Sequence, residues 1–184
     1  MNFVRHSELE GLHAPFSASQ SAWLRYDDEK LVTVYRNKKA AQMGTILHEW
    51  AKQTIDLRIK QPRSKKTLYS YINDAIGFRM STEVVLFYSN NFFGTADTIC
   101  FRNNVLRIHD LKTGAGPVHM EQLRVYAALF CLEYRVDPRE IETYLRIYQN
   151  DEVQDEMADP EEIKAIMEKI IHDDKLISQI ESEA

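Results

Sequence analysis

The sequence predicts an α/β domain in which helices flank a central mixed β-sheet. Segments with helical periodicity alternate with short strands rich in Val, Ile, Phe and Thr. The 184 residues fit one domain that is long enough to bury a sizeable core without disulfide or metal cross-links. With 44% hydrophobic and 28% charged residues, the composition is that of a globular chain and excludes a disordered or coiled-coil protein.

The helices are expected first at the N-terminal side of the chain. Residues 1–39 are predicted to be an irregular arm with a short helix over Ser19–Arg25. Apolar periodicity without proline predicts a helix over Ala40–Ile59, and a second, shorter one over Leu68–Met80. Pro117, a favourable first helical residue, opens a third helix that runs to about Tyr134.

Four strands and a terminal helix complete the predicted order, which is α-α-β-β-β-α-β-α. The predicted strands are Glu83–Tyr88, Phe93–Arg102, Val105–Lys112 and Ile141–Tyr148. A capping aspartate, an early proline and two acids at Asp159–Glu162 open the last helix, over 159–182. We therefore expect a single domain over 1–184, with its arm at 1–39 and its core at 40–150.

Export and membrane insertion are not expected. No apolar run approaches the roughly 18–20 residues of a membrane span. Arg5, Glu8 and Glu10 lie where a signal peptide needs its apolar core, so a cytoplasmic protein is expected. Cys100 and Cys131 are isolated, which excludes a zinc ribbon or a four-cysteine iron–sulfur cluster and predicts reduced thiols that fill space.

Charge is distributed unevenly along the chain, although the net charge is −5. Residues 30–80 hold eleven Lys or Arg against three acids, a balance of +8. Residues 133–184 hold six against sixteen, a balance of −10. Such asymmetry suggests a side that faces a polyanion, whereas the alternative is a solvated basic helix end and an acidic tail.

The most informative feature is a hairpin whose turn is Asn103-Asn104. Asparagine tolerates the positive φ angles of a two-residue type I′ turn. With Asn103 and Asn104 as the turn, Arg102 is expected to pair with Val105, and all further pairs have residue numbers that sum to 207. One face then carries Phe101, Ile99 and Asp97 beside Leu106, Ile108 and Asp110. The other face carries Thr98 and Cys100 beside Arg107 and His109 and is polar.

An apolar face therefore ends in two carboxylates, Asp97 and Asp110, that lie opposite each other. Like charges in that position are destabilising, and a divalent cation is the natural compensation. Lys112 points to the same face one pleat further on, where it can orient a water and stabilise negative charge on a phosphate. The alternative is an accidental acidic pair at the sheet edge with Lys112 as its salt-bridge partner.

Several motifs occur in one order on these elements. They are Gly44-Thr45-Ile46-Leu47-His48-Glu49, Gly94-Thr95-Ala96-Asp97, Asp110-Leu111-Lys112-Thr113-Gly114 and Gln122-x-x-x-Tyr126. Together they resemble the RecB-type branch of the PD-(D/E)XK nuclease superfamily over roughly residues 16–150, and Phe16-Ser17-Ala18-Ser19-Gln20 is similar to the start of phage-borne members. The resemblance implies a restriction-endonuclease-like core.

The resemblance also implies roles for the residues around the hairpin. Asp97, Asp110, the Leu111 carbonyl and His48 become ligands of one or two Mg²⁺ or Mn²⁺ ions, with a core histidine as the alternative for His48. Gln122 and Tyr126 then hold the substrate backbone or buttress Lys112, unless they only pack the helix on the sheet. Glu83 is a partner of Lys112, an outer metal ligand or a solvated strand end.

The function implied is a metal-dependent deoxyribonuclease, an exonuclease of recombination or repair. The alternative is a catalytically silent DNA-binding or assembly subunit. A stand-alone, phage-like protein in a bacterial cytoplasm is implied, with DNA and a single-strand annealing recombinase or a separate helicase as partners; the chain has no GxxxxGK[ST] motif of its own. The segment expected to contact the DNA backbone at the mouth of the site contains Arg58, Lys60, Arg63, Lys65 and Lys66.

Overall fold

The computed structural model describes residues 4–183 and divides the chain into two compact units, with the boundary between Thr45 and Ile46. The boundary falls inside the long helix α1 (Asp28–Asp56). The first unit also contains the 3₁₀ segments η1 (Ser7–Leu9) and η2 (Ala18–Arg25). η2 corresponds to the short helix predicted over Ser19–Arg25.

Helix α1 begins earlier and ends earlier than Ala40–Ile59. The Asp27 side chain accepts a hydrogen bond from the Lys30 backbone N–H at 2.8 Å and caps the helix, so residues 28–39 are helical and not irregular. At the other end, Arg58 adopts a left-handed φ of +56°, and the Ile59 N–H donates back to the Thr54 carbonyl at 3.0 Å. This reversal of the chain ends the helix.

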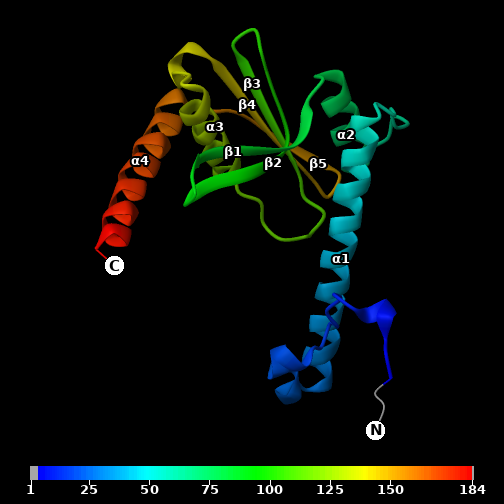
Figure 1. Ribbon diagram of the computed structural model, residues 1–184. Helices are drawn as coiled ribbons and strands as arrows, with labels where there is room; N and C mark the ends of the chain where they lie inside the picture. Colours follow the sequence, from blue (N-terminus) through cyan, green and yellow to red (C-terminus); the bar gives the residue numbers. More distant parts are fainter. Residues whose placement is uncertain (1–3, 184) are drawn as a thin grey trace. The chain divides into compact units, whose positions relative to one another are not determined.

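The second unit is built on a five-stranded sheet whose order is β1-β2-β3-β4-β5 (Figure 1). The strands are β1 (Ser81–Ser89), β2 (Phe92–Arg102), β3 (Val105–Leu111), β4 (Glu142–Gln149) and β5 (Glu152–Met157). β3 and β4 pair in parallel and the other pairs are antiparallel. The predicted class, an α/β fold with a mixed sheet flanked by helices, is confirmed.

The register of the β2–β3 hairpin is also confirmed. Arg102 pairs with Val105 and Ile99 with Ile108, which are the predicted partners. Asn103 and Asn104 have φ angles of +51° and +58°, as a type I′ turn requires.

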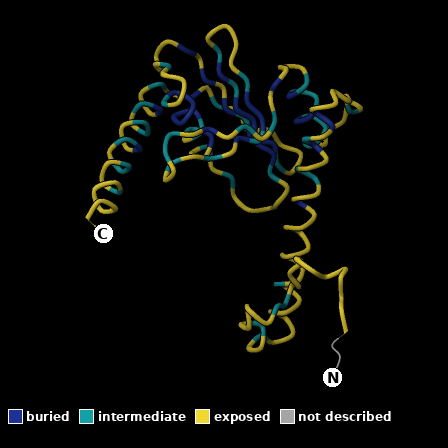
Figure 2. Tube along the Cα trace, in the orientation of Figure 1, coloured by how far each residue is buried: buried dark blue, intermediate teal, exposed yellow. Residues whose placement is uncertain are grey.

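Helices cover both faces of the sheet. On one face, α3 (Glu121–Tyr134) and α4 (Pro160–Ser182) enclose a core with strand residues such as Leu86, Ala96, Ile99 and Ile108. On the other, α2 (Thr67–Gly77) and the α1 residues Ala51 and Ile55 form a second cluster that includes Leu111 and Tyr148. Figure 2 shows the buried residues concentrated along the strands between these layers.

The second cluster corrects the prediction of a polar hairpin face. Thr98 is 0% exposed and His109 is 2% exposed. The Thr98 hydroxyl donates to the His109 carbonyl at 3.2 Å, so a hydrogen bond replaces the water that a polar face was expected to meet. The apolar side of α2 packs on this face of the sheet and excludes water from it.

Strand β5 is absent from the sequence prediction, and α3 begins later than expected. Asn150 and Asp151 have φ angles of +50° and +60° and turn the chain directly from β4 into β5. β5 is an edge strand of mostly polar and acidic residues, so it lacks the apolar alternation of a half-buried strand. Pro117 lies in a loop, because the Gln149 amide donates to the Gly114 and Gly116 carbonyls and holds that segment before α3 begins at Glu121.

The side-chain alternation of β2 is interrupted at Asp97. In a regular strand, residues three positions apart point to opposite faces of the sheet. Ala96 and Ile99 are three positions apart, yet both pack in the core beneath α3. On β1, Glu83 is at the opposing position and has a left-handed φ of +50°, between the pairs Thr82–Thr98 and Val84–Ala96. The irregularity coincides with the predicted site.

No helix within residues 4–183 has the length and apolar character needed to cross a membrane.

Candidate active site

The two predicted carboxylates lie together where β2 and β3 stop pairing. The last pair of that ladder is Thr98–His109, and the next positions are Asp97 and Asp110. There the Asp97 Oδ2 accepts a hydrogen bond from the Leu111 N–H at 3.0 Å. A side-chain oxygen of β2 thus bonds to β3 just beyond the last backbone pair. Asp110 is only 3% exposed.

Both carboxylates are in surroundings that disfavour their charge. Burial and, secondly, the charge of Asp110 raise the pKa of Asp97 to about 6, against the lowering effect of the Leu111 N–H and His48. Burial also raises the pKa of Asp110, which its bond to Lys112 opposes. Two neighbouring acids with raised pKa values, one buried and one half-buried, are the electrostatic pattern of a site that attracts cations.

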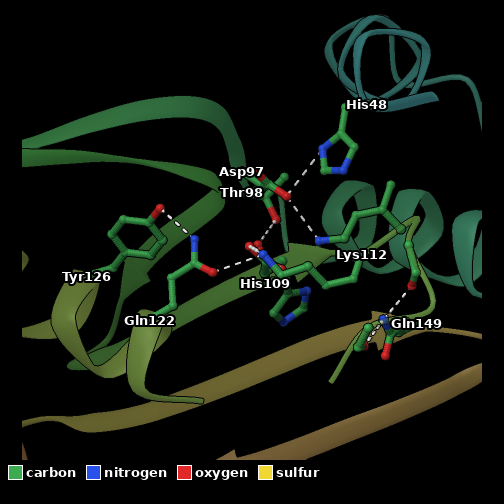
Figure 3. Close-up of polar contacts among 12 residues, drawn as sticks. His48, Asp97, Thr98, His109, Lys112, Gln122, Tyr126 and Gln149 are labelled. Atoms are coloured by element: carbon green, nitrogen blue, oxygen red, sulfur yellow. Dashed lines mark hydrogen bonds and ion pairs between the residues drawn. The ribbon is translucent and has the colours of Figure 1, made fainter. Parts of the chain in front are cut away.

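A histidine from α1 and a lysine at the end of β3 lie against these two carboxylates (Figure 3). The His48 Nδ1 lies 3.5 Å from the Asp97 Oδ2. The Lys112 Nζ lies 2.9 Å from the Asp110 Oδ2 and donates a hydrogen bond to its Oδ1 at 3.2 Å. The structure therefore brings together the four side chains that the sequence singled out from three separate elements.

Gln122 and Tyr126 of α3 continue this network. The Lys112 ammonium donates to the Gln122 Oε1 at 2.9 Å, and the Gln122 Nε2 donates to the Tyr126 hydroxyl at 3.0 Å. Gln122 thus occupies one hydrogen of the ammonium and fixes its direction. Of the roles left open by the sequence, this geometry favours buttressing of Lys112.

Gly94 makes room for the last member of this chain. A Cβ atom at Gly94 would lie 2.8 Å from the Tyr126 Cε1, closer than atoms of a packed interior approach one another. The glycine of the Gly94–Asp97 motif therefore has a steric reason: it lets α3 place Tyr126 against β2.

We expect Gly94→Ala to destabilise the protein by about 1–3 kcal/mol, because the added methyl group overpacks the contact with Tyr126. Urea unfolding measures this loss. The loss should shrink when Tyr126→Ala is made in the same chain, since the two changes act on one contact. Equal losses with and without Tyr126 would contradict the steric role.

The donor set at the two carboxylates fits a hard divalent cation. The Asp110 Oδ2 is buried, and its neighbour among the described residues is the Lys112 ammonium at 2.9 Å. Two carboxylates, a backbone carbonyl at Leu111 and an imidazole are ligands that Mg²⁺ or Mn²⁺ accepts. Within residues 4–183, however, no three His, Cys, Asp or Glu side chains already converge as a metal-binding group.

Glu83 is exposed and stands on β1 at the position opposite Asp97. After burial and Asp110, its charge is a further influence that raises the pKa of Asp97. Among the described residues, Lys112 forms its hydrogen bonds and ion pair with Asp110 and Gln122, so Glu83 is not its partner.

The predicted DNA-contacting segment is exposed. Lys60 and Arg63 line a hollow of about 640 Å³ together with Asp74 of α2, Arg146 of β4 and Asp155 of β5. None of the site residues lines that hollow. Arg58, Lys65 and Lys66 are also exposed.

A buried polar network next to the site was missed from the sequence. The Tyr148 hydroxyl donates to the Asp74 carboxylate at 2.7 Å and lies 3.3 Å from the His109 Nδ1, while Arg146 donates to the same carboxylate at 2.9 Å. Burial, then Arg146, lowers the pKa of His109 to about 3, so this imidazole is neutral. The network ties β3 and β4 to α2. The apolar stripe of the second predicted helix was the available signal that this face is covered.

Both cysteines are free thiols, as predicted. Burial raises the pKa of Cys131 to about 12 and also raises that of Cys100. Neither belongs to the site.

No protein-family model matches the chain, and a search of curated proteins gives no match. Among solved structures, a chain described as "Crystal structure of SSO0001" is similar over 82% of this chain and 67% of its own length. Its sequence identity is 17% and its TM-score is 0.36, which is too low to support an inference about fold family or function.

Proposed function

We propose that the protein is a metal-dependent deoxyribonuclease with a restriction-endonuclease-like core. The observation that supports this best is the pair of carboxylates, the half-buried Asp97 and the buried Asp110, with the Lys112 ammonium held against Asp110 at 2.9 Å. Hydrolysis of a phosphodiester forms a bond between water oxygen and phosphorus and breaks the bond to the leaving oxygen. Both events concentrate negative charge, which the Lys112 ammonium and a cation held by the carboxylates would neutralise.

Each residue of the site has a distinct role in this proposal. Asp97, Asp110, the Leu111 carbonyl and His48 would hold one or two Mg²⁺ or Mn²⁺ ions. When bound, such an ion lowers the pKa of a water and neutralises charge on the phosphate. Lys112 directs the attacking water and stabilises the charge that develops on the phosphate oxygens. Gln122 and Tyr126 hold the ammonium in the direction that this requires.

The second candidate is a silent DNA-binding or assembly subunit with the same fold. Such a subunit has no need to place two acids side by side, or to hold a lysine in position through hydrogen bonds with Gln122 and Tyr126. All of these groups are present in this chain and in contact, which favours turnover. By resemblance we further propose exonuclease action in recombination or repair, beside a strand-annealing recombinase or a separate helicase.

Digestion of linear and covalently closed circular duplex DNA tests the proposed activity. We expect degradation of the linear form in Mn²⁺ or Mg²⁺ and none in EDTA, while the closed circle stays intact because it has no end. Cutting of the circle would change the assignment from exonuclease to endonuclease. Binding of both forms without cleavage of either in any metal would support the silent subunit.

The basic segment 58–66 is proposed to contact phosphates of the bound DNA at the mouth of the site. Changing Arg63, Lys65 and Lys66 together to Gln should flatten the log–log dependence of DNA binding on salt by about 0.9 for each phosphate interaction that the change removes. The cleavage rate at saturating DNA should be unchanged, because these residues do not reach Asp97 or Asp110. Fluorescence anisotropy over a salt series measures the slope.

The matched control removes three lysines from α4, by changing Lys164, Lys169 and Lys175 to Gln. It makes the same change in net charge elsewhere on the chain. If the two triple variants have the same salt slope, the segment is basic for solubility and does not touch DNA.

A further inference from the structure

The outer face of the β1–β2 hairpin is apolar and exposed. Phe93 is 60% exposed and Phe87 is 45% exposed, and the two are direct partners across the hairpin. Val85, one pleat nearer the site, is also exposed. Residues 84–96 contain no acidic or basic side chain. Aromatic side chains grouped in this way on a surface indicate a binding site.

This face continues directly to the candidate active site. Gly94 lies against Tyr126 and Ala96 packs in the core beneath α3, so Phe93 and Thr95 point to the other side of β2. Asp97 follows two residues after Thr95, where the alternation breaks, and its carboxylate meets His48 of α1. Phe93 and Asp97 are four positions apart, which is about 13 Å along a strand and therefore a few nucleotides.

The opposite edge strand of the sheet, β5, is charged. β5 carries Glu152, Asp155 and Glu156, and such charges discourage pairing with other chains. β1 has no comparable protection over Val84–Tyr88, apart from the Glu133 carboxylate that accepts the Phe87 N–H at 2.9 Å. The apolar character of the hairpin is thus specific to this edge.

We propose that Phe87 and Phe93 stack on the unpaired bases of a single-stranded DNA end and lead that strand to Asp97. The proposal rests on the proposed nuclease function and names its substrate class. Bases stack on exposed aromatic rings regardless of sequence, and residues 84–96 carry no carboxylate of their own that would repel the phosphates of the strand. The duplex ahead of the strand is held by other contacts, such as those of segment 58–66.

The test compares Phe93→Ala with Phe101→Ala, a control on the same strand beyond Asp97, where the ring packs against Phe130. Anisotropy in EDTA measures binding to a blunt duplex and to duplexes with single-stranded overhangs. We expect Phe93→Ala to weaken overhang binding about ten-fold and blunt-duplex binding little. Phe93→Tyr should restore binding, whereas Phe93→Leu, which is apolar but has no ring, should not.

Overhangs with one abasic nucleotide locate the stacking position. For the parent, we expect a loss of affinity when the abasic position falls a few nucleotides from the cleaved bond, and no such loss for Phe93→Ala. In Mn²⁺, the variant should raise KM for overhang substrates and leave kcat unchanged.

Three outcomes would overturn the proposal. The first is equal behaviour of Phe93→Ala and Phe101→Ala while the parent cuts DNA, which removes the hairpin's role and leaves the nuclease function standing. The second is dissociation of an oligomer by Phe93→Ala, seen by sedimentation, without a selective loss of overhang binding, which would make the face a protein interface. The third is a parent that cuts no DNA in Mg²⁺ or Mn²⁺, which defeats the proposed function itself.

Discussion

Asp110→Asn is expected to reduce DNA cleavage by about a thousand-fold or more while the protein remains folded. The substitution keeps the shape of the side chain and removes the charge that a divalent ion needs. Because burial raises the pKa of the Asp110 carboxyl, a neutral amide relieves an unfavourable charge when no metal is present. The melting temperature in EDTA should therefore not fall, and Lys112, which is partly exposed, keeps its bond to Gln122.

Asp97→Asn is the companion variant and should lose cleavage to a similar extent. Asparagine is chosen over alanine because the Asp97 Oδ2 accepts the Leu111 N–H, and an amide oxygen can replace it. Alanine would leave that partly buried donor without a partner and confuse a loss of fold with a loss of chemistry. If either asparagine variant melts much lower than the parent in EDTA yet still cuts DNA, the acids are structural.

Lys112→Ala is expected to abolish cleavage to a comparable degree but to leave Mn²⁺ binding nearly intact. The ammonium contacts Asp110 and Gln122, and it is not itself a metal ligand. Removing it frees the Asp110 carboxylate for a cation, so affinity for Mn²⁺ should stay equal or rise slightly. Isothermal titration calorimetry of the purified variant measures this affinity directly.

Lys169→Ala is the matched control for Lys112→Ala, because Lys169 lies on α4 and pairs with Asp173 of its own helix. It should change neither cleavage nor Mn²⁺ binding. If Lys112→Ala loses Mn²⁺ as completely as Asp110→Asn does, the lysine organises the metal site and does not act on the phosphate.

The hairpin was predictable from the sequence because its turn fixes its register. Once Asn103 and Asn104 are placed in the turn, the register follows as far as the pair Thr98–His109, and Asp97 and Asp110 come next to it in the structure. The position of Lys112 followed from strand periodicity, whereas Gln122 was singled out by the resemblance. The register and the position of Lys112 depend on local geometry, which tertiary packing changes little.

Other features depended on tertiary packing and were not predictable by the same rules. The burial of His109 could be predicted only by knowing that α2 covers that face of the sheet. A histidine on a strand whose neighbours carry arginines is otherwise expected to face solvent. β5 is held by pairing with β4 and has no apolar pattern of its own. The position of segment 58–66 depends on the chain reversal at Arg58, which ends α1 before the predicted Ile59.

The most direct test of the central claim is the cleavage of an end-labelled linear duplex by the parent and by Asp110→Asn, side by side, in Mn²⁺ and in EDTA. We predict cleavage by the parent in Mn²⁺ and none in the other three reactions, with both proteins folded and binding the DNA in EDTA. Equal cleavage by parent and variant would show that the paired carboxylates are not the catalytic centre. DNA binding by the parent without cleavage would contradict the nuclease assignment.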